Sequence, residues 1–451
     1  GLAQLRGQQI SKATVIAATG IGKTYLAAFD FKQSRCQRLL FIAHRQNILS
    51  NARESFERVL GNKDFGEFLG NGNNVSKSSP GVFAMIQTLS RKAHLKKFYP
   101  EEFDYIVVDE FHHGEATTYR KVIDYFKPEF LLGLTATPER MDGRNILRLC
   151  DYNIAYEVRL LEAVDRGWLS PFQYFAVYDE TDYEKITWRG THYDEDELTK
   201  ALSDDNRTAI VAHNLKKYLP SSGKVRALAF CSSVAHALYT AKRLNEDHNI
   251  ESVCLFGKSS ESEREKAIRR LESAEDALEV ICTVDIFNEG IDIPDLTHVL
   301  FLRPTQSFTI FLQQLGRGLR KAESKEYLVV IDFVGNFRKA HVAPLALCGY
   351  TSVDQYISEL KYFKNGKIIP QLPEGCYLSP EIDVRRIWDR EIREIMNRLS
   401  PEERLKMLYQ DIKQDIGNKP LSLNDMIDNA YDIDPYVFIK QFNGWILGCV
   451  C

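Results

Sequence analysis

Short apolar runs rich in β-branched residues alternate with longer helical patterns over most of this chain. Continuous apolar runs are typical of strands buried on both faces of a parallel sheet, and helices are the usual crossovers between such strands. The alternation is interrupted between about residues 160 and 220 and then starts again. We therefore predict an α/β protein with two tandem domains, each a parallel sheet flanked by helices. The expected strands are Thr14–Ala18, Arg38–Ala43, Tyr105–Val108, Leu131–Leu134, Val225–Phe230, Ser252–Phe256, Leu278–Cys282, Thr297–Leu302 and Tyr327–Ile331, and a helix is expected over Asn47–Leu60.

The length supports this division, because a single hydrophobic core rarely grows beyond roughly 250–300 residues and the chain has 451. We expect the first domain over residues 1–160, the second over residues 161–345, and a small, mostly helical region without strands over residues 346–451. The segment Tyr178–Glu197, rich in Tyr, Asp and Glu, is predicted to be an exposed hairpin or excursion. Helices of the last region are predicted over Ser352–Tyr362, Pro380–Leu399 and Pro401–Ile416.

The composition is that of an ordinary globular protein, with 44% hydrophobic and 27% charged residues, which excludes fibrous and largely disordered classes. The net charge of −4 argues against a basic protein that coats nucleic acid. The nine cysteines include no Cys-x-x-Cys pair, so a zinc site is not expected. We predict buried, reduced thiols at Cys231 and Cys282, and terminal thiols at Cys449 and Cys451. No membrane-spanning run or signal peptide is visible, which favours a cytoplasmic location.

A glycine-containing loop lies between the first predicted strand and the helix that follows it. Residues 17–24 read AATGIGKT. Glycines allow backbone amides to turn toward phosphate oxygens, and the N-terminus of the helix adds a partial positive charge. In such a loop Lys23 would reach the β- and γ-phosphates and Thr24 would bind Mg²⁺. Ala17 replaces the usual first glycine, and a chance glycine-rich turn is the alternative; the strand–loop–helix order favours the phosphate loop.

Two carboxylates follow the predicted strand Tyr105–Val108. Ligands of open parallel sheets bind at the carboxyl ends of the strands. We predict that Asp109 holds hydrated Mg²⁺ and that Glu110 orients and deprotonates the attacking water. The alternative is a solvated acidic turn, but the phosphate loop upstream favours the metal site. His112 is predicted to link this site to another element.

The order of the motifs in this chain resembles that of superfamily 2 helicases and translocases, nearest to the DEAD/DEAH-box and restriction-enzyme helicase-subunit type. The resemblance covers roughly residues 10–335. It implies two RecA-like domains with a nucleotide cleft between them. The motifs that carry it are ATGIGKT (18–24), AHR (43–45), DEFH (109–112), TAT (135–137), FCSS (230–233), TVDIFNEGIDIPD (283–295) and QQLGRGLR (313–320).

The resemblance also implies roles for the matching positions. Nucleotide binding is expected at Thr19, Gly20, Gly22, Lys23, Thr24, Gly290 and Asp292. Catalysis is expected from Lys23, Asp109, Glu110, Arg317 and Arg320, and Mg²⁺ binding from Thr24 and Asp109. Contacts with the nucleic-acid backbone are expected from His44, Arg45, Thr88, Ser232 and Thr283. Coupling of hydrolysis to movement is expected from His112, Thr135, Thr137 and Gln313.

Arg317 and Arg320 are three residues apart, so on a helix both would point from one face into one cleft. An arginine stays charged and binds phosphate oxygens with its planar fork, which suits the charge that develops on a transferred phosphoryl group. The alternative is a basic helix end, since Lys321 adjoins Arg320. The spacing within the ordered motifs favours arginines that act on the nucleotide.

The region before the phosphate loop departs from the resembled pattern. Such proteins usually carry an adenine-recognising Gln segment well upstream of the phosphate loop, but only Gly1–Val15 precedes it here, and Gln8 and Gln9 lie too close. We expect ATP to be the nucleotide, with base specificity left open.

The segment Ile416–Trp445 resembles small helical modules appended to some bacterial helicases, or belongs to a bundle that packs on the second domain. The chain is expected to be a motor core cut from something longer.

The resemblance implies an ATP-dependent, Mg²⁺-dependent helicase or translocase that binds DNA rather than RNA, without sequence preference. An ATPase that remodels complexes without separating strands, an RNA helicase, and a scaffold that only binds nucleotide are the alternatives. Tyr178–Glu197 is the candidate wedge for strand separation. A nuclease partner and a role in repair or restriction are expected by analogy with the family only.

Overall fold

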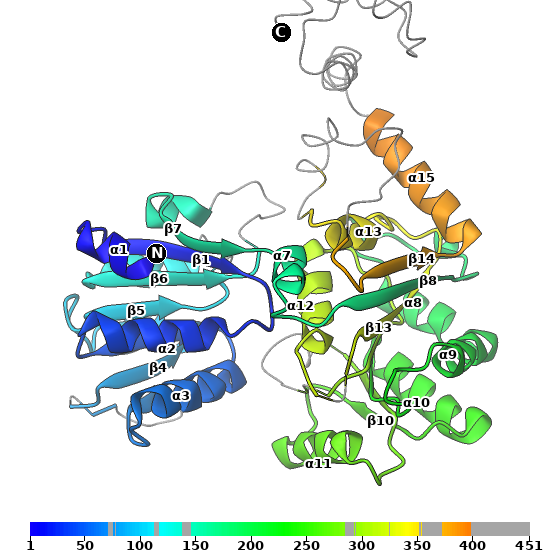
Figure 1. Cartoon of the computed structure of the whole chain (residues 1–451), viewed down its shortest axis with the longest axis horizontal. Helices are drawn as coiled ribbons and strands as arrows, with labels where there is room; N and C mark the ends of the chain where they lie inside the picture. The colour runs from blue at the N-terminus through cyan, green and yellow to red at the C-terminus, as the bar shows by residue number, and fades with distance from the viewer. Residues whose placement is uncertain are drawn as a thin grey trace, which may run out of the picture.

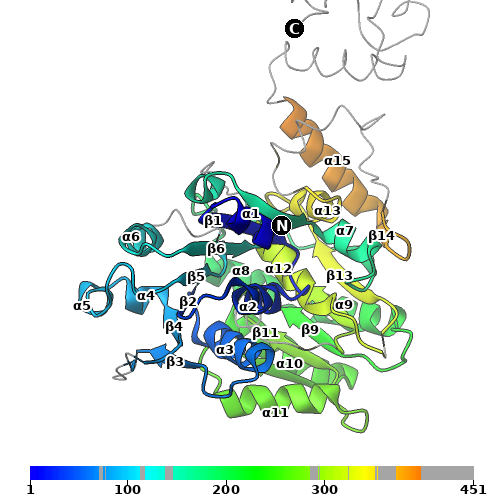
Figure 2. The same ribbon diagram turned by 60° about the vertical axis from the view of Figure 1, so that its left-hand side comes forward.

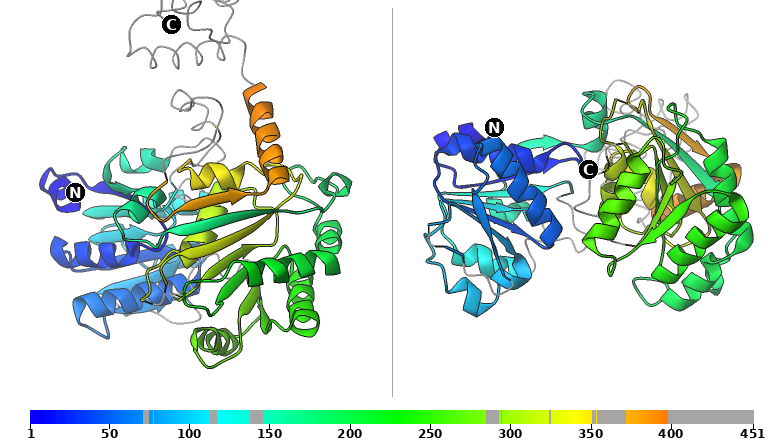
Figure 3. Two further views of the ribbon diagram at one scale, coloured as in Figure 1. Left: turned by 45° about the vertical axis from the view of Figure 1, so that its right-hand side comes forward. Right: turned by 90° about the horizontal axis from the view of Figure 1, so that it is seen from below.

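The computed structural model describes residues 1–70, 75–76, 78–111, 117–137, 146–284, 293, 295–323, 325–350, 353 and 372–397. These residues form two lobes that lie side by side (Figures 1 and 3). Each lobe is built on a seven-stranded sheet in which all paired strands are parallel. The predicted fold class is therefore confirmed.

The first lobe has the strand order β3-β4-β2-β5-β6-β1-β7. Helices cover both faces of its sheet, and each face has its own buried apolar cluster. The strands are β1 (Lys12–Ala17), β2 (Leu39–Ala43), β3 (Gly66–Leu69), β4 (Gly81–Met85), β5 (Tyr105–Val108), β6 (Phe130–Thr135) and β7 (Ile154–Val158). The helices are α1 (Leu2–Gly7), α2 (Lys23–Ser34), α3 (Gln46–Leu60), α4 (Ile86–Leu89), α5 (Lys92–Leu95) and α6 (Thr117–Tyr125), followed by the 3₁₀ helix η2 (Ile146–Cys150).

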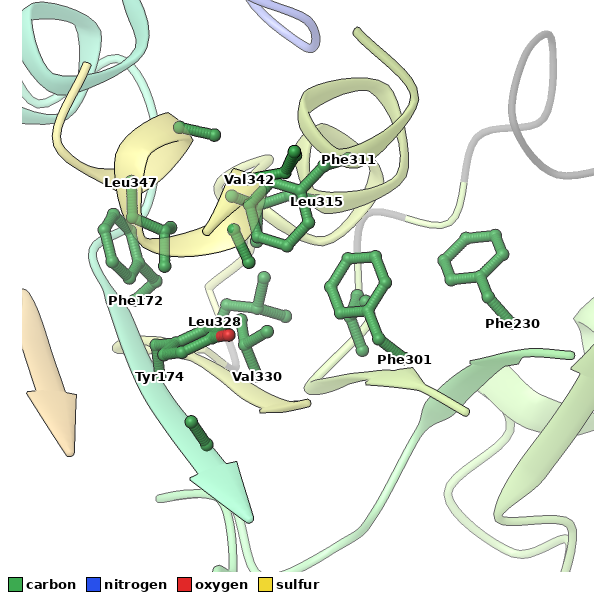
Figure 4. Packing of buried hydrophobic residues seen from close by; sticks show 14 of the residues in the cluster. Phe172, Tyr174, Phe230, Phe301, Phe311, Leu315, Leu328, Val330, Val342 and Leu347 are labelled. Carbon is green, nitrogen blue, oxygen red and sulfur yellow. The ribbon is translucent and has the colours of Figure 1, made fainter. Parts of the chain in front are cut away.

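The second lobe has the strand order β10-β11-β9-β12-β13-β8-β14. One face of its sheet packs on α12, and Figure 4 shows Phe311 and Leu315 of that helix pointing toward Phe301 and Val330 of the strands. The strands are β8 (Phe172–Tyr178), β9 (Ala227–Phe230), β10 (Ser252–Leu255), β11 (Val280–Thr283), β12 (His298–Phe301), β13 (Leu328–Val334) and β14 (Tyr377–Pro380). The helices are α8 (Glu195–Leu202), α9 (Asp205–Lys217), α10 (Val234–His248), α11 (Glu261–Glu272), α12 (Phe308–Gly318), α13 (Val342–Leu347) and α15 (Ile382–Asn397), with the 3₁₀ helix η3 (Tyr183–Lys185).

The two sheets repeat one topology. If the strands of each lobe are counted from one to seven along the chain, both orders become 3-4-2-5-6-1-7. The two strands that begin the lobes, β1 and β8, thus occupy equivalent positions, and so do the edge strands β7 and β14. Because all strands are parallel, equivalent loops lie at equivalent edges of the two sheets.

A short connection joins the lobes. Strand β7 ends at Val158, helix α7 (Leu160–Asp165) follows, and β8 begins at Phe172. The connection is hydrogen-bonded to the end of α12, because the Ser170 amide donates to the Leu319 carbonyl at 2.7 Å and the Ser170 hydroxyl donates to the Arg320 carbonyl at 3.3 Å. The connection is therefore already in contact with the second lobe ahead of β8, the first strand of that lobe.

The nine strands predicted from apolar runs all occur, and the helix predicted over Asn47–Leu60 is α3. Five strands were missed. Strands β3 and β4 each begin with a glycine, and β3 contains Glu67. Strands β7, β8 and β14 mix polar residues into their runs, and only part of β7 is buried. Cys231 and Cys282 are buried free thiols, as predicted. Cys449 and Cys451 lie outside the described residues.

The expectation that strands stop after residue 346 is wrong, because β14 pairs with β8. The second sheet thus extends past the boundary expected at residue 345. The helix predicted over Pro380–Leu399 is α15, whereas Ser352–Tyr362 is largely, and Pro401–Ile416 and Ile416–Trp445 are wholly, outside the described residues. No described helix combines the length and apolarity that a membrane span requires.

The segment Tyr178–Glu197 is largely exposed, as predicted, but a few buried aromatic residues hold it on the second lobe. Tyr183 is 1% exposed, its ring packs edge-on against Phe337 at 5.3 Å between centroids, and Tyr193 packs beside it at 5.9 Å. The buried aromatic residues anchor the segment in the core of the second lobe. The predicted hairpin occurs around the antiparallel bridge between Trp188 and Tyr193. The Arg189 amide donates to the His192 carbonyl at 2.7 Å, and the Asp194 amide donates to the Thr187 carbonyl at 2.8 Å.

Candidate nucleotide-binding site

The phosphate loop follows β1 and ends where α2 begins at Lys23. Gly20 has φ +97° and Gly22 has φ +89°, values in the left-handed region that residues with a side chain rarely adopt. These two turns place the loop over the N-terminus of a twelve-residue helix, where free amides and the helix dipole favour an anion. The Lys23 amine donates to the Ala17 carbonyl at 3.0 Å, so its side chain folds back over the loop.

The charge of Lys23 is set by groups from both lobes. Burial is the largest influence and lowers the pKa of its amine below the ordinary value, while the carboxylates of Glu110 and Asp109 act in the opposite direction. Arg317 and Arg320 lower the pKa of the Lys23 amine further. Burial likewise lowers the pKa of the Arg320 guanidinium. An anionic ligand that touches these three cations would offset their mutual repulsion.

The two carboxylates lie at the carboxyl end of β5. The Asp109 amide continues the sheet by donating to the Ile42 carbonyl at 2.9 Å, and an Asp109 carboxylate oxygen accepts the Glu110 amide at 2.9 Å. Glu110 has φ +49°, a left-handed conformation that costs a non-glycine residue about 1–2 kcal/mol. Such strain is concentrated at functional sites, where surrounding structure holds it in place.

The Phe111 side chain holds the strained turn at Glu110 against the neighbouring strand β6. A Cβ atom added to Gly133 of β6 would lie 2.5 Å from the Phe111 ring, so the ring rests directly on the glycine backbone. Phe111 is fully buried. The neighbouring strand therefore positions the loop that carries Glu110, and this contact could not be read from the spacing of the motif.

The second lobe reaches the phosphate loop through α12. A Cβ atom on Gly316 would lie 2.6 Å from the Thr19 Cβ, and one on Gly20 would lie 3.1 Å from the Gly316 carbonyl oxygen. Figures 1 and 2 show α12 on the side of the second lobe that faces the first. This close approach brings Arg317 and Arg320 into the same cavity as Lys23.

The groups of the two lobes share one cavity of about 540 Å³. Its chemistry fits a nucleoside triphosphate with Mg²⁺, because it combines an anion-binding loop with the cations Lys23, Arg317 and Arg320 and with the adjacent carboxylates Asp109 and Glu110. Thr24 and Asp109 would hold the metal. The predicted site residues that line the cavity are Thr19, Gly20, Gly22, Lys23, Thr24, Asp109, Glu110, Arg317 and Arg320.

Two family models match this chain. The model described as "Type III restriction enzyme, res subunit" matches residues 2–140, and the model described as "Helicase conserved C-terminal domain" matches residues 210–322. The chain belongs to superfamily 2 of the helicases. It is of the restriction-enzyme subunit type, within a superfamily of ATP-hydrolysing enzymes.

The helicase is similar to the Saccharomyces cerevisiae protein named "Putative ATP-dependent helicase IRC3", with 27% identity over 365 residues, 77% of this chain and 52% of the yeast protein. It is 26% identical over 367 residues to the Escherichia coli type I restriction enzyme EcoAI endonuclease subunit, 72% of this chain and 43% of that subunit. The chain spans about half the length of the curated relatives it matches. Its fold matches that of the ATP-dependent Type ISP restriction-modification enzyme LlaBIII bound to DNA, with a TM-score of 0.60 and 17% identity over 98% of this chain and 35% of LlaBIII.

One wall of the helicase cavity was not predicted from sequence. Helix α3 contributes several polar side chains, and the Arg58 guanidinium donates to the Tyr25 hydroxyl at 2.7 Å across the gap to α2. Their spacing of three and four residues places them on one face of the helix, which is the signal that could have identified them. The α3 side chains missed in this way are Asn51, Glu54, Ser55 and Arg58, and Tyr25 of α2 was missed as well.

The predicted coupling residues connect the helicase lobes directly. The Thr135 hydroxyl donates to the Thr137 carbonyl at 3.1 Å, and the Thr137 hydroxyl donates to the Thr309 hydroxyl at 3.2 Å. Thr309 lies in the first turn of α12, two turns before Arg317. Gln313 of the same helix is buried. His112, Gly290 and Asp292, expected to take part in coupling and nucleotide binding, lie outside the described residues.

The predicted nucleic-acid contacts follow neighbouring strands in each lobe. His44 and Arg45 come after β2 and Thr88 lies in α4 after β4, and β2 pairs with β4. In the second lobe Ser232 follows β9 and Thr283 ends β11, and these strands also pair. In the shared topology the two pairs of strands are equivalent.

The exposure of these residues differs. His44, Arg45, Thr88 and Ser232 are partly exposed, and the Gln87 amide donates to the His44 carbonyl at 3.2 Å. Thr283 is 0% exposed. Its side chain therefore does not lie on the surface of the protein.

Proposed function

We propose that this chain hydrolyses ATP in the cavity between its two lobes and uses the cycle to move along DNA. The observation that carries the proposal is the meeting of groups from both lobes in one cavity. Lys23, Asp109 and Glu110 come from the first lobe, and Arg317 and Arg320 come from the second. A site divided in this way is complete only when the lobes approach each other, so hydrolysis and lobe movement are coupled.

Each group has a role that its position allows. Lys23 would hold the β- and γ-phosphates, and Mg²⁺ would neutralise charge on the same oxygens. Glu110 would orient the attacking water and accept its proton, which the fixed turn between Asp109 and Phe111 supports. Arg317 and Arg320 would meet the charge that grows on the γ-phosphoryl oxygens, a contribution worth ~10³–10⁵ in rate in other phosphoryl-transfer enzymes.

Movement would follow from the contacts that join the lobes. The Thr137–Thr309 hydrogen bond ties the end of β6 to the helix that carries the arginines. A change at the γ-phosphate would therefore shift α12 and the surfaces after β9 and β11. A strand held by His44, Arg45, Thr88 and Ser232 would be gripped through its phosphates, without sequence preference and more weakly in high salt.

DNA is the proposed track because the relatives favour it. The E. coli relative is a subunit of a restriction enzyme, and LlaBIII is bound to DNA in its structure. Strand separation is not part of the proposal. The segment Tyr178–Glu197, the wedge candidate from the sequence, is anchored in the second lobe by Tyr183 and Tyr193.

The test is the steady-state ATPase rate with Mg²⁺ in the presence of single-stranded DNA, duplex DNA or RNA, with Lys23→Ala as the inactive control. We expect stimulation by DNA and a weaker response to RNA. A displacement assay for a protein block or a third strand on duplex DNA then measures movement directly. Stimulation by RNA alone, or hydrolysis without displacement, would contradict the proposed DNA translocation.

A further inference from the structure

A second cavity of about 390 Å³ opens beside the phosphate loop. It shares Ile21, Gly22 and Lys23 with the cavity that holds the catalytic groups, so the two spaces meet at the loop itself. A molecule whose phosphates lie on the loop would reach this second space past the residues that line both cavities. The mechanism proposed above makes no use of it.

The lining of this second cavity is apolar and aromatic. The polar side-chain groups among the described residues that line it are the shared Lys23 amine, the Tyr156 hydroxyl and the Trp168 indole N–H. Trp168 is 46% exposed, a large apolar surface to leave open to solvent. Beyond the shared loop, the lining comes from Gly1, Leu2, Ala17, Leu26, Ala155, Tyr156 and Trp168.

Local structure holds the two aromatic rings in place. Helix α7 ends at Asp165, and Gly167 turns the chain two residues later with a φ of +67°. The Trp168 amide donates to the Ala163 carbonyl at 2.9 Å. The Arg166 guanidinium donates to the Tyr156 hydroxyl at 2.9 Å and lies 5.1 Å from the centre of the Trp168 ring. One cation therefore fixes both rings, which lowers the entropy that a ligand would lose on stacking against them.

We propose that this second cavity is the nucleobase pocket of the site and that Trp168 is a stacking residue for the base. The inference rests on the proposed function, because it takes the triphosphate to lie on the phosphate loop. A nucleobase is flat and largely apolar on its faces, and stacking on aromatic side chains binds every base through its π-face. The aromatic wall of this pocket comes from Tyr156 of β7 in the first sheet and from Trp168 in the connection between the lobes.

The composition of the pocket wall predicts its selectivity. Discrimination between adenine and guanine requires hydrogen bonds to the base edges, and the described side chains that line the pocket include no carboxylate or amide. Purines present a larger stacking face than pyrimidines. The pocket therefore selects purine over pyrimidine triphosphates and separates ATP from GTP only weakly.

The same wall is joined to the catalytic arginines. Two residues after Trp168, Ser170 bonds to the backbone of Leu319 and Arg320 at the end of α12. Leu169 packs toward Gly20, with its Cδ2 3.3 Å from where a Cβ would lie on that glycine. A base stacked on Trp168 thus orders the segment that carries Arg320, so loss of stacking raises KM mainly and reduces kcat to a smaller extent.

The experiment compares Trp168→Ala with wild type and with Phe29→Ala, an exposed aromatic residue of α2 that does not line the pocket. Equilibrium binding of ATP, GTP, CTP and inorganic triphosphate is measured by calorimetry, and hydrolysis of the same nucleotides is measured in parallel. We expect Trp168→Ala to weaken ATP and GTP binding about tenfold and to leave the binding of inorganic triphosphate unchanged. Phe29→Ala should match wild type throughout, and Trp168→Phe should recover most of the ATP affinity.

The outcomes separate the two proposals. If wild type binds ATP but hydrolyses none with DNA or RNA present, the proposed function fails and the stacking role can still hold. If wild type is active and Trp168→Ala binds ATP as tightly as wild type does, the nucleobase pocket is wrong. An equal loss of ATP and inorganic triphosphate binding would also overturn the inference, because Trp168 would then support the phosphate loop rather than the base.

Discussion

The two lobes share one strand order, but the loop after their first strand has opposite chemistry. After β1 the chain forms a glycine-containing phosphate loop open to the cavity. After β8 it forms a turn in which Asp179 is 4% exposed and accepts the Arg207 guanidinium at 3.2 Å and the Tyr183 hydroxyl at 2.7 Å. The same position in the topology is a binding site in one lobe and a closed ionic contact in the other.

This difference shows how a repeated scaffold becomes an asymmetric site. The first lobe binds at its strand ends, as open parallel sheets usually do. The second lobe closes its own equivalent position and instead extends the end of α12 over the loop of its neighbour. Substitutions can separate the binding site of the first lobe from the closed contact and the extended α12 of the second.

The largest effect is expected from the arginine that crosses between the lobes. Arg317→Ala should lower kcat for DNA-stimulated ATP hydrolysis by ~10³-fold or more, because the second lobe would no longer stabilise charge on the γ-phosphoryl group. Arg317→Lys should recover little, since an ammonium lacks the planar fork. Nucleotide affinity, measured by calorimetry, should stay near that of wild type. Hydrolysis at the wild-type rate would mean that the first lobe acts alone.

The closed turn of the second lobe is expected to serve stability. Arg207→Ala would leave the buried Asp179 carboxylate without its charged partner, and removing one partner of a buried pair typically costs ~3–5 kcal/mol. The matched control is Arg243→Ala, whose partly exposed pair with Asp205 should contribute ~1 kcal/mol or less. Chemical unfolding followed by circular dichroism measures both. Equal costs for the two variants would remove the contrast between the lobes.

The same pair predicts a pH dependence. Burial by itself would raise the pKa of Asp179, but the charge of Arg207 and hydrogen bonds from Thr181 and Tyr183 lower it below the ordinary value. The folded state therefore keeps this carboxylate ionised at lower pH than the unfolded state does. Its contribution to the free energy of unfolding is complete above the unfolded value of about 3.9 and is lost as the pH falls through the lower folded value. In acid titrations Asp179→Asn should lack this component.

A smaller loss is expected where the backbones of the two lobes touch. Gly316→Ala would place a methyl group 2.6 Å from the Thr19 Cβ, so α12 must withdraw from the phosphate loop. A misplacement of about 1 Å in an active site can cost ~10²-fold in rate. Gly318→Ala is the matched control, because its methyl group would meet Leu328 of its own lobe at 2.5 Å. The first variant should lose activity with an unchanged unfolding midpoint, and the second should lose stability.

The smallest effect is expected on the binding of single-stranded DNA. Arg45→Ala should weaken binding to single-stranded DNA about equally for all sequences and reduce the slope of log affinity against log salt concentration by about one. ATP binding without DNA should not change. Fluorescence anisotropy over a range of salt concentrations tests this, and a loss of ATP affinity of the same size would place Arg45 in the nucleotide site instead.

Local patterns were enough to predict the strands that are continuous apolar runs and the loops directly attached to them. The phosphate loop and the Asp109–Glu110 pair were identifiable because their chemistry lies within a few residues of a buried strand. The wall formed by α3, the Thr137–Thr309 contact and the placement of Trp168 were not, because each depends on segments that only the folded chain brings together. The need for glycine at residues 133 and 316 was hidden for the same reason, since it comes from a neighbour distant in sequence.

The edge strand β14 has a consequence for how the protein is made. Tyr377 pairs with Gln173. One edge of β8, the first strand of the second lobe, is therefore covered only by a strand that lies about two hundred residues downstream. The Trp388 ring of α15 then stacks on Tyr174 with 6.3 Å between ring centroids. During synthesis β8 leaves the ribosome long before β14 and α15 are made. The amides and carbonyls on the edge that β14 will cover are then exposed and can pair with a strand of another molecule. A shortened chain that ends between β13 and β14 would keep that edge open permanently, and its solubility would suffer even though every catalytic residue was present.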